Sequence, residues 1–85
     1  MSDVKIAPEN LIVALVLDVR DLSCPMPLLR TKKEIDKIGS GEILHIQGTD
    51  LGSRNDIPNW CKRAGHEYLG ERKESGYISF FIKKG

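Results

Sequence analysis

The chain has 85 residues, which is enough for one domain with a small core. Thirteen basic residues oppose twelve acidic ones, so the net charge of +1 supplies no bulk attraction to nucleic acid or to an anionic membrane. Apolar residues make up 40% and charged residues 29% of the chain, as in a folded globular domain rather than a disordered one. We therefore expect one domain, residues 11–85, with no direct binding of nucleic acid or membranes.

The beginning of the chain is expected to be an extension rather than part of the fold. Residues 1–10 are polar, contain Pro8 and show no period, so we predict a flexible segment. They also lack the basic start and cleavage site of a signal peptide. The longest apolar run, Leu11 to Leu17, is shorter than the roughly 18 residues of a membrane helix. We expect a cytoplasmic protein, whose thiols stay reduced.

The residue pattern changes from that of a strand to that of a helix at the stretch LSCPMP. The run LIVALVLDV, Leu11 to Val19, is dense in β-forming residues and predicts a strand. The stretch LSCPMP follows, and Pro25 marks the start of a helix because proline is favoured at the first helical position. Cys24 is thereby predicted to lie at or near the N-cap, between a strand and a helix.

The predicted helix has an apolar face and a basic face, and it ends at Gly39 or Gly41. The apolar positions are Leu28, Thr31, Ile35 and Ile38; the basic ones are Arg30, Lys33 and Lys37. The segment from Glu42 to Gly48 alternates apolar and polar residues and predicts a second strand. The two strands should be parallel and joined by a right-handed crossover.

The second half of the chain predicts one more helix and a hairpin. Pro58 indicates that the regular helix begins near Asp56, after an irregular or 3₁₀ turn, and Gly65 supplies its end. Two β-forming runs then flank the polar turn Glu74 to Gly76. The order βαβαββ predicts an α/β two-layer sandwich, a four-stranded mixed sheet with two helices on one face.

Cys24 is the leading candidate for chemistry. At a helix N-terminus, partial positive charge and free N–H groups favour the thiolate, so we expect a lowered pKa. The rings of Pro25 and Pro27 stiffen the turn. Because neither residue has an N–H, fewer hydrogen bonds are available that could lower the reactivity of the sulfur. The alternative is that Cys24 is a small N-cap substitute without a chemical role.

The second cysteine is expected to be structural. Cys61 lies beside Trp60 on the apolar stripe of the second helix, where a free cysteine acts as a small buried hydrophobe. The reducing compartment and the two helix positions disfavour a disulfide with Cys24. Zinc ligands would have to come from both cysteines with His45 and His66, which lack the paired short spacings of zinc sites. We therefore predict no metal and no cofactor.

The basic face of the first helix begins near Cys24 and is a candidate docking surface for an acidic partner. It comprises Met26, Arg30, Lys33 and Lys37. The alternative is an ordinary solvated face. As an RNA-binding signal the same face is weak, because most of the few aromatic residues fall in the apolar pattern.

Taken in order, LDVRDLSCPMPLLRTKKEIDKIGSGEILHI, TD and DIPNWCKRAGHEYL resemble the TusA-like (SirA-like) family of sulfur-carrier proteins from Leu17 onward. The family's hallmark is Cys-Pro-x-Pro, which is here Cys24, Pro25, Met26 and Pro27. The resemblance implies the βαβαββ fold, with Cys24 accepting sulfur from a persulfide on a cysteine desulfurase or rhodanese. It implies an acceptor protein, for instance of the DsrE type, and a relay toward 2-thiouridine in tRNA, molybdenum cofactor or sulfur oxidation.

Two positions depart from the family pattern. Asp21 stands where the family usually has glycine, which would place a negative charge near the sulfur and oppose the helix dipole. Asp50–Leu51 stands in place of a frequent Asp-Pro. Our first hypothesis is a sulfurtransferase that is a monomer in isolation; the second is a non-enzymatic protein- or RNA-binding module in which Cys24 is incidental.

Overall fold

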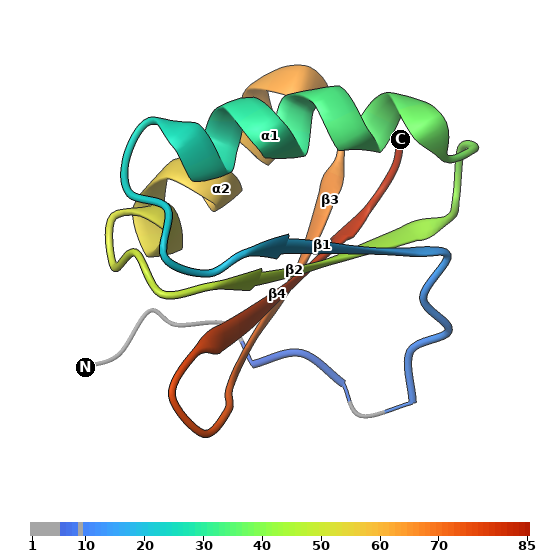
Figure 1. Cartoon of the computed structure of the whole chain (residues 1–85). Coiled ribbons are helices and arrows are strands. Elements are labelled where there is room, and N and C mark those ends of the chain that lie inside the picture. Colours follow the sequence, from blue (N-terminus) through green and yellow to red (C-terminus); the bar gives the residue numbers. More distant parts are fainter. Residues whose placement is uncertain (1–5, 9) are drawn as a thin grey trace.

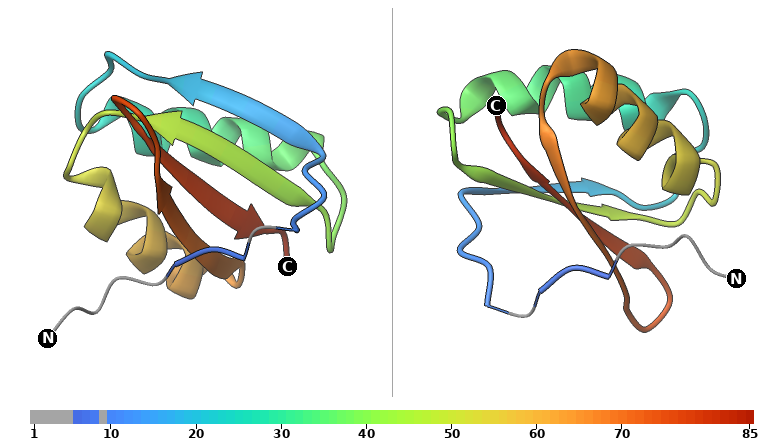
Figure 2. Two further views of the ribbon diagram at one scale, coloured as in Figure 1. Left: turned by 90° about the horizontal axis from the view of Figure 1, so that it is seen from below. Right: turned by 180° about the vertical axis from the view of Figure 1, so that it is seen from behind.

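The computed structural model describes residues 6–8 and 10–85, and it has the predicted βαβαββ order (Figure 1). The sheet order is β1-β2-β4-β3, in which only β1 and β2 are parallel. Both helices cover one face of this mixed sheet, which confirms the predicted α/β two-layer fold (Figures 1 and 2). The elements are β1 (Leu15–Val19), α1 (Met26–Glu34), the 3₁₀ turn η1 (Ile35–Lys37), β2 (Ile43–Gly48), α2 (Ser53–Ala64), β3 (Glu67–Lys73) and β4 (Ile78–Lys83).

The core lies between the sheet and the two helices. The strand β2 alternates as predicted, with Leu44 and Ile46 fully buried and His45 partly exposed on the other face. The apolar face of the first helix is also confirmed, because Thr31 and Ile35 are buried. The buried cluster consists of Leu17, Val19, Ile35, Ile38, Leu44, Ile46, Ile57, Cys61, Ile78, Phe80 and Ile82. This packing fixes both helices over the sheet.

The first strand is shorter than the run of β-forming residues that predicted it. Instead of beginning at Leu11 it begins at Leu15, which is the first residue in register with a residue of β2, Leu44. β2 begins at Ile43, whose carbonyl accepts a hydrogen bond from the Ala14 N–H at 2.8 Å, so residues 11–13 lie beyond the start of β2. Pairing, rather than propensity, sets the start of the strand.

The second helix begins earlier than predicted, at Ser53 instead of near Asp56, and it contains Pro58. Its first turn explains the difference. The N–H groups of Ser53, Arg54 and Asn55 donate to carbonyls three residues back, at 3.1 to 3.2 Å. The predicted 3₁₀ turn therefore exists, but it is continuous with the helix. At the other end, Gly65 has φ of 85° and caps α2 as predicted.

Part of the predicted N-terminal extension lies beside β3. The N–H of Ala7 donates to the Glu71 carbonyl at 3.0 Å, and Arg72 donates to the Pro8 carbonyl at 2.8 Å. The segment leading to β1 runs on the side of the sheet away from the helices (Figure 2). Residues 1–5 and 9, which belong to the same predicted extension, lie outside the described residues. Within the described part of the chain, none of the helices is long and apolar enough to cross a membrane.

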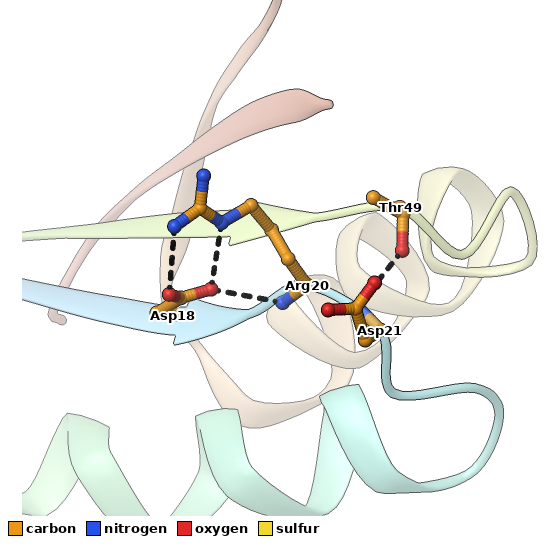
Figure 3. A network of polar contacts seen from close by, with 4 residues as sticks. All are labelled: Asp18, Arg20, Asp21 and Thr49. Atoms are coloured by element: carbon orange, nitrogen blue, oxygen red, sulfur yellow. Dashed lines mark hydrogen bonds and ion pairs between the residues drawn. The ribbon is translucent and has the colours of Figure 1, made fainter. Parts of the chain in front are cut away.

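The loop after β1 is tied to the end of β2 through Asp21. Its N–H donates to Thr49 Oγ1 at 3.1 Å, beside an ion pair of Arg20 with Asp18 (Figure 3). Asp21 has φ of 71°, a conformation that glycine adopts freely and aspartate tolerates. This backbone geometry would also suit the glycine that the family resemblance led us to expect here.

We predict that Asp21→Val lowers the free energy of unfolding by about 1–2 kcal/mol, because a β-branched residue resists positive φ. For Asp21→Gly, the matched control, the free energy of unfolding should differ from that of the parent protein by less than about 0.5 kcal/mol. Glycine adopts this positive φ without strain, but it loses more conformational entropy on folding, and the two effects offset each other. Urea unfolding measures both. Equal stability of the two variants would contradict the prediction.

Candidate functional site

The site is built from two loops that the parallel strands bring to one edge of the sheet. Because β1 and β2 are parallel, their carboxyl ends meet at this edge, and each continues into a loop that leads to a helix. Cys24 lies in the first loop, exposed, one residue before the N-cap of α1, Pro25. The second loop carries Asp50 and leads into α2. The only side chain that hydrogen-bonds to Cys24 among the described residues comes from this second helix.

The start of α1 sets the position of the sulfur. Pro25 is the N-cap, so the helix begins at Met26, one residue later than predicted. The peptide bond between Cys24 and Pro25 is cis. The N–H of Met26 donates to the Ser23 carbonyl at 2.9 Å, and that bond occupies one of the first-turn donors that we expected to be free. The helix N-terminus therefore stabilises a thiolate on Cys24 less than the sequence predicted.

The thiol faces a carboxylate instead. Cys24 Sγ donates a hydrogen bond to Asp56 Oδ2 at 3.7 Å. Partial desolvation raises the pKa of Cys24, and the charge and hydrogen bond of Asp56, followed by the charge of Asp50, raise it further. The predicted lowering of this pKa is wrong, because partial desolvation of the sulfur and the acidic residues of the second loop and α2 act in the opposite direction. The responsible acids are Asp50 and Asp56, in place of Asp21.

The sequence analysis used Asp56 only to mark the start of the second helix and Asp50 only as a departure from the family pattern, and it missed that both act on the cysteine. The signal was present in the topology. A strand, helix and strand in parallel order place the loops after both strands at one edge, so polar residues in the second loop should approach Cys24. That inference gives the neighbourhood, but the distance requires the structure.

Exposed apolar side chains accompany the basic face of α1. Met26 is 41% exposed and Leu29, which the sequence pattern did not single out, is 49% exposed. Leu51, next to Asp50, is 68% exposed. The cations Arg30, Lys33 and Lys37 are exposed as predicted, although Lys37 Nζ pairs with Glu34 Oε2 at 3.0 Å. Arg30 and Lys33 have no ion pair among the described residues.

The other cysteine and the two histidines lie in different surroundings. Cys61 is 1% exposed in the core, where burial raises its pKa to about 12. His45 Nε2 contacts Ser79 Oγ at 2.8 Å, while His66 Nδ1 accepts a hydrogen bond from the Gly85 N–H at 3.1 Å. Both cysteines are free thiols. In residues 6–8 and 10–85, no three His, Cys, Asp or Glu side chains gather as metal ligands do.

Comparison with known proteins decides the family. The family model described as Sulfurtransferase TusA matches residues 15–84. The chain belongs to the TusA family. Sulfur transfer is thus the general activity of the family to which it belongs.

Individual TusA-family relatives agree with this assignment. The sulfur carrier protein TusA of Allochromatium vinosum is 41% identical over 68 residues, which cover 80% of this chain and 90% of that protein. YrkI of Bacillus subtilis is 44% identical over 70 residues, 82% of this chain and 93% of its own. A crystal structure of a SirA-like protein from Desulfitobacterium hafniense has a TM-score of 0.67 at 26% identity, covering 84% of this chain and 97% of its own.

We predict that iodoacetamide modifies the folded protein once, at Cys24, and leaves Cys61 unmodified. Cys24 is exposed, whereas Cys61 is buried and its pKa is about 12, so it supplies almost no thiolate at pH 8. Peptide mapping after alkylation identifies the modified residue. After unfolding in urea both cysteines should react, which serves as the control. Modification of Cys61 at a similar rate in the folded protein would contradict its burial.

Proposed function

We propose that this protein is a sulfur carrier that holds sulfur as a persulfide on Cys24. The observation that carries the proposal is the exposed thiol of Cys24 at the meeting point of two loops, in a chain of the TusA family. Cys61 is unsuited to the role because it is buried. Pro25 and Pro27 support the site, since one is the N-cap of α1 and the other is buried in its first turn.

The proposed transfer consists of two thiol exchange steps. The Cys24 thiolate attacks the terminal sulfur of a persulfide on the donor, a new S–S bond forms, and the donor's own cysteine leaves as a thiolate. A cysteine thiolate of the acceptor then attacks the terminal sulfur on Cys24, and Cys24 leaves as a thiolate in turn. Atoms and charge balance in each step without a metal, a cofactor or a redox partner.

The proposed donors are a cysteine desulfurase or a rhodanese, and the proposed acceptor is a DsrE-type or related protein. The relay would serve tRNA 2-thiouridine formation or dissimilatory sulfur oxidation. Relatives named sulfur carrier protein TusA support the carrier role. The cytoplasm suits this chemistry, because a reducing compartment keeps Cys24 from forming unwanted disulfides.

We predict that incubation with a cysteine desulfurase and cysteine adds about 32 Da per sulfur atom to the protein, and that a thiol reductant removes the added mass. Cys24→Ser should take up no sulfur, whereas Cys61→Ser, the matched control, should still load if it remains folded. Intact mass spectrometry measures the gain. If the wild-type protein never gains this mass, or Cys24→Ser gains it, the carrier role is excluded, and a binding module in which Cys24 is incidental becomes the better hypothesis.

We further propose that partners dock over the exposed basic face of α1, the surface formed by Met26, Arg30, Lys33 and Lys37. The contribution of Lys37 should be smaller, because its ammonium already pairs with Glu34. Charge complementarity of this kind acts mainly on the rate of association and weakens with salt.

Reversing the charge of Arg30 and Lys33 together should slow sulfur loading about tenfold at low salt, and less in 0.5 M salt, because steering is screened. The matched control reverses Lys62 and Arg63, which lie exposed in the last turn of α2, at its opposite end from the acidic loop. The initial rate of mass gain gives the comparison. Equal slowing in both double variants would mean that general charge, rather than this surface, governs docking.

A further inference from the structure

The immediate surroundings of the Cys24 sulfur are acidic, although its proposed chemistry passes through sulfur anions. Asp56 of α2 contacts Sγ at 3.7 Å, and Asp50 of the preceding loop adds a second negative charge. On the other elements, α1 has no acidic residue in its first turn and its first cation is Arg30. The loop that carries Cys24 contributes Asp21, whose N–H is bound by Thr49.

The backbone that carries Asp56 and the side chain of Asp50 are both held by contacts within the fold. The N–H of Asp56 donates to the Gly52 carbonyl at 3.0 Å, and its neighbour Ile57 is fully buried in the core. Asp50 Oδ2 accepts a hydrogen bond from Ser53 Oγ at 3.4 Å. A group held by packed elements keeps its geometry through a reaction, which is what a positioning residue requires.

The first turn of α2 is also fastened to the sheet. Arg54 lies between Ser53 and Asp56 in this turn, and its guanidinium pairs with Glu71 Oε2 of β3 at 2.8 Å. The Glu71 side chain is almost fully buried. This ion pair connects the first turn of α2, on which Asp56 lies, to the edge strand β3.

We propose that Asp56 is a positioning residue for sulfur release: it accepts the hydrogen bond of the empty carrier's thiol and repels the anionic persulfide of the loaded carrier. This inference rests on the proposed function. Asp56 favours transfer of sulfur from Cys24 to the acceptor, because its carboxylate stabilises the empty carrier and destabilises the loaded carrier. Asp50 acts in the same sense through its charge alone.

The release step shows where the effect arises. The acceptor's thiolate attacks the terminal sulfur of the Cys24 persulfide, the S–S bond to Cys24 breaks, and the electron pair remains on Sγ. Sγ then takes a proton from solvent and donates it in the hydrogen bond to Asp56. Before the step, the persulfide is a stronger acid than the thiol and is mainly anionic at neutral pH, so it faces Asp56 as a like charge; the form attacked is its protonated fraction, whose proton leaves with the transferred sulfur. The direction of the shift in the Cys24 pKa agrees with this assignment.

The test uses Asp56→Asn, which removes the charge and keeps an acceptor at the same place. The control is Asp36→Asn, which removes an exposed carboxylate from η1. For the empty protein, the pH profile of alkylation by iodoacetamide should move to lower pH in Asp56→Asn, and the rate at pH 7 should rise about three- to tenfold. The sign follows because removing a nearby negative charge lowers the thiol pKa and increases the thiolate fraction.

The second readout is the sulfur equilibrium. With the intact protein in a glutathione and glutathione persulfide mixture, the ratio of loaded to empty carrier should rise about three- to tenfold in Asp56→Asn and stay unchanged in Asp36→Asn. Asp50→Asn should give smaller changes in the same direction, and circular dichroism shows whether each variant is folded. A purely structural role for Asp56 would move neither the pH profile nor this ratio in a folded variant.

The outcomes separate this inference from the proposed function. Unchanged profiles and ratios in folded Asp56→Asn, while the wild-type protein still loads sulfur, overturn the role of Asp56 and leave the carrier role standing. If Asp56→Asn is not folded, Asp50→Asn decides by the same two measurements. A wild-type protein that never loads sulfur overturns the carrier role, and with it the role in release.

Discussion

The parallel pairing of β1 with β2 is the constraint on which the site depends. Because the two strands run in the same direction, Val19 pairs with Gly48, and the loops that follow these residues leave the sheet side by side. One loop carries Cys24, and the other carries Asp50 and leads to Asp56. An antiparallel pair would have sent these loops to opposite ends of the sheet. The contact between sulfur and carboxylate is therefore a consequence of topology.

The site also shows a balance between two local electrostatic effects. A helix N-terminus favours an anion, but α1 begins after Cys24, and two of the first residues near the sulfur are prolines without an N–H. The full charge of Asp56 acts on the sulfur from 3.7 Å, while the α1 terminus offers only partial charges. Desolvation of the sulfur and this carboxylate together outweigh the helix terminus, and they raise the pKa of the Cys24 thiol above its ordinary value.

Much of the fold followed from periodicity, because burial dictates it directly. The alternation of β2, the apolar face around Thr31 and the cap at Gly65 were predicted correctly, since each depends on residues within one element. The start of β1 was wrong because it depends on where β2 begins. The start of α2 was wrong because a 3₁₀ turn joined the helix. For the site, the place of Cys24 between a strand and a helix was predicted, but its pKa depends on desolvation in the folded protein and on a residue 32 positions away.

A carrier and a catalyst place opposite demands on their cysteine, and this difference gives the acidic surroundings of Cys24 a rationale. A catalytic thiolate that turns over alone gains from a lowered pKa, since more of it is reactive at neutral pH. A carrier meets its sulfur only on a partner and must afterwards give that sulfur away. For such a protein, stabilising the thiol of the empty carrier favours release of the sulfur. The placement of Asp56 on α2 suits a carrier that must release its sulfur better than a catalyst that needs a reactive thiolate.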